Sequence, residues 1–81
     1  AKMDATYQQF TKRLQTAFPK LQKMDIRYCI LWKLGYTKKF IIELMNTSED
    51  NYFKRLQRIK ARIDDSKKWE KGELEQFMQN F

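Results

Sequence analysis

Residues 34–63 constrain the fold of this chain more than any other stretch. They hold an apolar pattern with helical spacing that ends near Met45, then three polar residues, then a longer basic pattern with helical spacing. Thr37 and Ser48 each precede one of these patterns, where a hydroxyl can accept a hydrogen bond from a free backbone amide of the first turn. The sequence therefore predicts a helix of about nine residues from Thr37, a short turn at Asn46, and a second helix from Ser48 to Ile63.

The apolar residues of these two helices indicate which side of each is buried. Both sets recur at helical spacing, so each is expected to form one core-facing stripe. The residues are Phe40, Ile41, Leu44 and Met45 in the shorter helix, and Tyr52, Leu56, Ile59 and Ile63 in the longer one. Phe53 lies off the second stripe, and three roles stay open for it: a rim contact with the first or last helix, insertion against a thymine methyl, or packing in a dimer.

Two helices are expected before this pair. In residues 4–17 apolar side chains recur at steps of three and four, and Pro19 ends that helix because proline removes a backbone donor. The next helix begins around Lys23 to Asp25 and runs to about Lys33, with Asp25 in the first turn, where a carboxylate favours the helix dipole. Residues 28–32 are apolar in succession, so this helix is expected at the centre of the bundle, and Gly35 is placed to terminate it. The apolar stripe of the first helix comprises Tyr7, Phe10, Leu14 and Phe18.

A terminal helix within residues 69–81, with Leu74, Phe77, Met78 and Phe81 at helical spacing, completes the set. With 81 residues there is room for one domain, and with only 2 Gly and 1 Pro a turn-rich β-fold is disfavoured. We therefore predict a single domain over residues 1–81, an all-α compact bundle of about five helices. Its three-helix core contains a helix-turn-helix, flanked by N- and C-terminal helices.

Several function classes find no support in the composition. The chain has no His and a single Cys, so it lacks the usual general base, a zinc-binding cluster and an internal disulfide, and no glycine-rich loop could hold a phosphate. We expect no enzyme activity, no metal, no cofactor and no small-molecule ligand. No apolar run is long enough to span a membrane and no signal-peptide pattern is present, so a cytoplasmic protein is expected.

Charge favours a polyanionic partner. The net charge is +7, yet residues 64–81 carry more acidic than basic groups, so the basic excess ends where the longer helix of the pair ends. An α-helix fits the DNA major groove, where side chains near its N-terminus reach the bases and flanking cations neutralise phosphates. Asn51, Lys54, Arg55 and Arg58 recur at helical spacing and are expected to share one face opposite the core stripe.

A resemblance to a known family accompanies this pattern. Residues 34–48, LGYTKKFIIELMNTS, resemble the scaffold helix and turn of LuxR-type (GerE-like) helix-turn-helix domains, with matches at Gly35, Thr37, Lys39, Ile41, Leu44 and Ser48. The flanking helices resemble a variant found at the C-termini of larger regulators in Bacteroidetes. The resemblance implies a helix-turn-helix DNA-binding output domain, the C-terminal part of a longer, homodimeric transcription regulator.

The expected function is therefore DNA binding with the longer helix in the major groove. Asn51 could read adenine, Lys54 or Arg55 could read guanine, and Arg58 and Arg62 are expected at the backbone. The expected interface with double-stranded DNA consists of Thr37, Lys38, Lys39, Ser48, Asn51, Lys54, Arg55, Arg58 and Arg62. The alternative, motivated by Ile42, Glu49, Asp50 and Phe53, is a degenerate helix-turn-helix that acts as a protein-interaction or dimerisation module.

Overall fold

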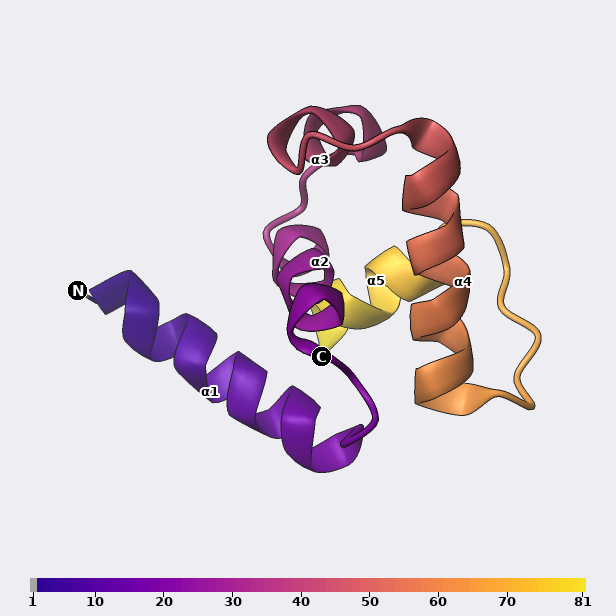
Figure 1. The fold of residues 1–81 in the computed structure, drawn as a ribbon. Helices are drawn as coiled ribbons and strands as arrows, with labels where there is room; N and C mark the ends of the chain where they lie inside the picture. The colour runs from indigo at the N-terminus through magenta and orange to yellow at the C-terminus, as the bar shows by residue number, and fades with distance from the viewer. Residues whose placement is uncertain (1) are drawn as a thin grey trace.

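The computed structural model describes residues 2–81 and the side chains of residues 8–81. The described chain forms five helices and contains no strand, so the predicted all-α bundle is confirmed. The helices are α1 (Lys2–Ala17), α2 (Lys23–Lys33), α3 (Lys38–Leu44), α4 (Glu49–Asp64) and α5 (Glu73–Asn80). Figure 1 shows α2 at the centre, α1 to one side, α4 on the other side, and α3 above them between the ends of α2 and α4.

The residues predicted to begin and end the helices adopt the conformations and hydrogen bonds expected of them. Gly35 adopts a φ of +85° after α2, and Asn46 adopts a φ of +51° after α3, a left-handed conformation that asparagine tolerates better than most residues. The Thr37 hydroxyl accepts a hydrogen bond from the Phe40 amide at 3.3 Å, and the Ser48 hydroxyl accepts one from the Asn51 amide at 3.1 Å. The turn between α3 and α4 is therefore fixed at both ends.

The core forms around α2, as its sequence predicts. The helices whose backbones lie closest are α2 and α5, followed by α1 and α2. Buried apolar side chains converge from all five helices, and the Phe10, Phe18, Phe77 and Phe81 rings pack together with centroids 5.7–6.0 Å apart in four pairs. Tyr7, the first residue of the predicted α1 stripe, lies outside the described side chains. The buried residues include Phe10, Leu14, Ile26, Cys29, Trp32, Ile41, Tyr52, Leu56, Ile59, Leu74 and Met78.

The buried side of α3 differs from the prediction. Ile41 is fully buried and Met45 is partly buried, but Phe40 is 44% exposed and Leu44 is 55% exposed. Two apolar pairs with a spacing of four residues lie about 100° apart on a helix, and a helix of seven residues presents only one strip to the core. The pair Ile41 and Met45 takes that strip, and Phe40 and Leu44 are left on the outer side.

The last helix lies within the predicted range of residues 69–81 and begins at Glu73. Gly72 adopts a φ of +80° and directly precedes α5. A left-handed residue interrupts the helical hydrogen-bond pattern, so Trp69 lies in the loop before α5 and packs its ring edge-to-face on Phe77 at 5.8 Å. The start at Glu73 leaves residues 65–72 as the connection that returns the chain from α4 to the core.

Cys29 offers a chemical test of this core. Its side chain is fully buried in α2, and burial, assisted by the nearby charge of Asp25, raises the pKa of the thiol to about 12. The thiolate is the reactive form, so alkylation at pH 8 requires opening of the bundle. We expect iodoacetamide to label Cys29 at least about a hundredfold more slowly in the folded chain than in the chain unfolded in urea. Equal labelling rates would contradict the position of Cys29 in the core.

Candidate nucleic-acid interface

Helix α4 has a buried side, an exposed side and two flanks. Tyr52, Leu56 and Ile59 are buried against the core, as predicted. Asn51, Lys54 and Arg58 are exposed to solvent on the opposite side. Of the two flanks between these sides, one faces α2 and the other faces α3 and α5. The contacts made on each flank determine which residues of α4 remain accessible to a partner.

The flank of α4 that faces α2 is held by a buried carboxylate. Asp25 is fully buried in the first turn of α2. One of its oxygens accepts a hydrogen bond from Arg55 at 3.0 Å, and the other accepts hydrogen bonds from Arg62 and, at 2.9 Å, from the Gln22 amide. Charge-assisted bonds of this kind are the strongest that side chains form. Asp25 thus fixes both the start of α2 and the rotation of α4 about its own axis.

These contacts correct the predicted face of α4. Arg55 was expected beside Asn51, Lys54 and Arg58, but its side chain is only 23% exposed because it turns toward Asp25. The Arg62 side chain is 26% exposed for the same reason. Arg55 and Arg62 are seven residues apart, so they share one flank of the helix. The spacing in the sequence shows that the two arginines share a flank, but only the tertiary structure shows that Asp25 of α2 lies against that flank.

A second tie between α2 and α4 involves two aromatic residues. The indole nitrogen of Trp32 donates a hydrogen bond to the Tyr52 hydroxyl at 3.0 Å inside the core. Burial raises the pKa of the Tyr52 hydroxyl, so it stays protonated at neutral pH. The two helices are therefore joined at both ends of α2, by Asp25 near its start and Trp32 near its end.

The acidic residues at the start of α4 are paired with lysines. Glu49 lies 3.4 Å from the Lys38 ammonium of α3, and Asp50 lies 3.2 Å from the Lys54 ammonium one turn further along α4. All four side chains are at least 45% exposed, so each pair contributes about 0–1 kcal/mol and exchanges readily with solvent or another charge. The negative charge at this end of α4 is offset by neighbouring lysines.

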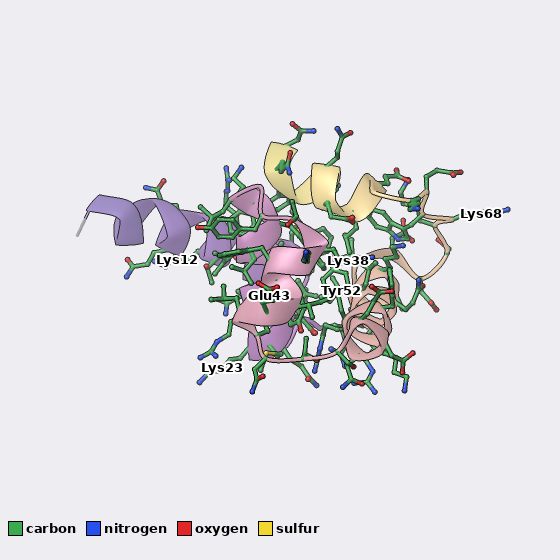
Figure 2. All side chains as sticks on the ribbon, turned by 90° about the horizontal axis from the view of Figure 1, so that it is seen from above. Lys12, Lys23, Lys38, Glu43, Tyr52 and Lys68 are labelled. Carbon is green, nitrogen blue, oxygen red and sulfur yellow. The ribbon has the colours of Figure 1, made fainter. Side chains whose placement is uncertain are left out.

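Phe53 occupies the flank of α4 that faces α3. Its ring packs edge-to-face on Tyr52 at 5.6 Å, and the Lys38 ammonium lies 5.1 Å from its centroid. Phe53 therefore makes its contacts with Tyr52 and with Lys38 of α3, and not with the first or last helix as one of the three open roles had it. Figure 2 shows Lys38 reaching from α3 toward Tyr52. The Phe53 side chain borders a cleft of about 510 Å³. The cleft is lined by Lys38, Tyr52, Phe53, Leu56, Gln57, Lys60, Lys71, Gly72 and Glu75.

The remaining predicted site residues lie around the turn between α3 and α4. The Thr37 and Ser48 hydroxyls act as helix caps, and Lys39 is exposed at the start of α3. Gln57, which the sequence did not single out, is also exposed on α4, three residues after Lys54. Its spacing from Lys54 places it on the adjoining part of the exposed face. The exposed lysine, arginine and amide side chains of α3 and α4 are therefore Lys38, Lys39, Asn51, Lys54, Gln57 and Arg58.

Other kinds of site find no counterpart in the part of the chain that the structure describes. There, no three side chains of the metal-binding types lie close enough together to hold an ion. No helix among residues 2–81 is both long and apolar enough to cross a membrane. Comparisons of the chain with protein-family models, with curated proteins and with solved structures found no match.

Proposed function

We propose that this domain binds double-stranded DNA, with the exposed face of α4 in the major groove. The observation that carries the proposal is the separation of the polar residues of α4. Arg55 and Arg62 are held by Asp25, whereas Asn51, Lys54 and Arg58 lie exposed on successive turns, opposite the buried stripe. An α-helix presenting amide and cationic side chains along one face has the shape and the donors that the major groove accepts.

Each exposed side chain has a role that follows from its chemistry. Asn51 is in the first turn of α4 and, like Gln57, can bond two atoms of an adenine edge. Lys54 can exchange its carboxylate partner Asp50 for a guanine oxygen or a phosphate, and Arg58 is placed for a phosphate. Lys39, across the turn on α3, is a second phosphate ligand. The proposal places the domain in a cytoplasmic transcription regulator of LuxR-type character.

A module that contacts only protein is the second candidate. It is favoured by Phe40 and Leu44, two large apolar side chains that the fold leaves on the outer side of α3. Neither residue is needed to hold α3 in place, because Ile41 fills the core position. The protein contact is centred on Phe40 and Leu44 of α3 and the DNA contact on α4, so substitutions at these apolar residues and on α4 test the two candidates separately.

Fluorescence anisotropy on a random-sequence duplex and on duplexes enriched by selection provides the test. Three phosphate contacts, from Lys39, Lys54 and Arg58, should give a log–log dependence of affinity on salt with a slope of about −2.7, at −0.9 per contact. Selected duplexes should bind more tightly than random ones at every salt concentration. A chain that binds neither duplex at low salt would exclude DNA as the partner.

A further inference from the structure

The outer side of α3 and the loop just before it carry an apolar strip. Tyr36, Phe40 and Leu44 are spaced four residues apart and are 43%, 44% and 55% exposed. The Tyr36 and Phe40 rings pack on each other with centroids 4.7 Å apart, so they form one continuous apolar surface. Contiguous exposed apolar side chains are typical of surfaces that another molecule covers.

The charged residues beside the strip indicate what covers it. Lys39 and Glu43 are one turn apart on α3 and lie on the same flank of the strip. When two copies of a helix pair antiparallel about a two-fold axis, the same flank of each lies together and runs in opposite directions. Lys39 of each copy then lies across from Glu43 of the other. The charge pattern of this surface is therefore complementary to itself in the antiparallel arrangement.

We infer that a second copy of this chain docks on the α3 strip, forming a two-fold dimer in which the two α3 helices run antiparallel. Phe40 of each copy packs against Leu44 of the other, and two Lys39–Glu43 pairs border the contact. None of Asn51, Lys54 or Arg58 lies on α3, so the dimer leaves the exposed face of α4 free. This surface shares only Lys39 with the proposed DNA interface, and the inference does not depend on DNA binding.

The strip is small, and this sets the strength of the dimer. Interfaces that bury less than about 1,200 Å² belong to weak or transient associations. A contact made by one seven-residue helix from each copy falls in that class. We therefore expect dissociation in the range of about 10 µM to 1 mM, so that a second binding event, such as occupation of two adjacent sites, would hold the copies together.

Charge exchange in the absence of DNA tests the dimer and its direction. Lys39→Glu and Glu43→Lys should each weaken self-association at least about tenfold, because each places like charges across the two-fold axis. An equimolar mixture of the two variants should dimerise as well as the unchanged chain, since every facing pair is then of opposite charge. The double variant Lys39→Glu/Glu43→Lys should also recover self-association. Sedimentation at concentrations up to about 1 mM gives the dissociation constants.

Two apolar variants complete the experiment. Phe40→Ala should weaken the dimer at least about tenfold, whereas Phe53→Ala, which removes a ring that is 42% exposed on α4, should change it by less than about twofold. Circular dichroism confirms that each variant folds. A chain that stays monomeric at about 1 mM, or a dimer that is indifferent to both charge reversals and not restored by mixing, overturns the inference. DNA binding by a monomeric chain would leave the proposed function standing without the dimer.

Discussion

Replacement of Asp25 by asparagine should lower the free energy of unfolding by about 3–5 kcal/mol, the typical cost of removing one member of a buried ion pair. Asparagine keeps the size of the side chain but removes the charge that holds Arg55 and Arg62. The two guanidinium groups would remain only about one quarter exposed and would lack their counter-ion. For a chain of 81 residues this loss is a large part of the total stability.

Urea unfolding followed by circular dichroism measures this loss, and Asp50→Asn is the matched control. Asp50 also pairs with a basic residue of α4, but its side chain is 80% exposed, so its replacement should cost no more than about 1 kcal/mol. The difference between the two variants isolates the effect of burial. Equal losses for Asp25→Asn and Asp50→Asn would show that the Asp25 network contributes no more than a surface pair.

Reversal of charge at Arg58 should reduce the affinity for a DNA duplex on the order of a hundredfold at low salt. Arg58→Glu removes one cationic contact from the centre of the exposed face of α4 and introduces a carboxylate that phosphates repel. The side chain makes no core contact, so the free energy of unfolding should stay within about 0.5 kcal/mol of the unchanged chain. Anisotropy titrations and urea unfolding measure the two quantities on the same sample.

Lys12→Glu provides the control for net charge. Lys12 is exposed on α1, on the opposite side of the molecule from α4 (Figure 2), and its reversal changes the total charge by the same amount. We expect less than about a threefold loss of affinity for this variant. If both reversals weaken binding equally, DNA is attracted by overall charge, and the exposed face of α4 is not the interface.

The ends of α2, α3 and α4 could be predicted because local chemistry determines them. Gly35 and Asn46 adopt left-handed conformations that few other residues accept, and the Thr37 and Ser48 hydroxyls satisfy amides within three residues of their own position. Each of these features depends only on a residue and its immediate neighbours. The sequence placed α5 only within residues 69–81, since the helical spacing of apolar residues says nothing about the conformation of Gly72.

The sides that the helices present to one another depend on contacts distant in sequence. The pattern of α3 contains two apolar pairs of equal quality, and only the positions of the other helices decide that Ile41 enters the core and Phe40 does not. Arg55 has the charge and the hydrogen-bond donors of a DNA-binding residue, but its guanidinium group is paired with Asp25, thirty positions earlier. Local patterns therefore predicted the helix-turn-helix layout, while the tertiary structure was required to show which arginines pair with Asp25 and which stay exposed.

That division along α4 affects how the domain can change over evolution. The residues that orient the helix, Arg55 and Arg62, point to α2, and those open to a partner, Asn51, Lys54 and Arg58, point to solvent. Substitutions on the solvent side leave the anchoring pairs intact and cost little stability. The exposed positions can therefore be randomised in a library without loss of the fold, and natural drift at these positions can alter the recognised partner while the bundle is conserved.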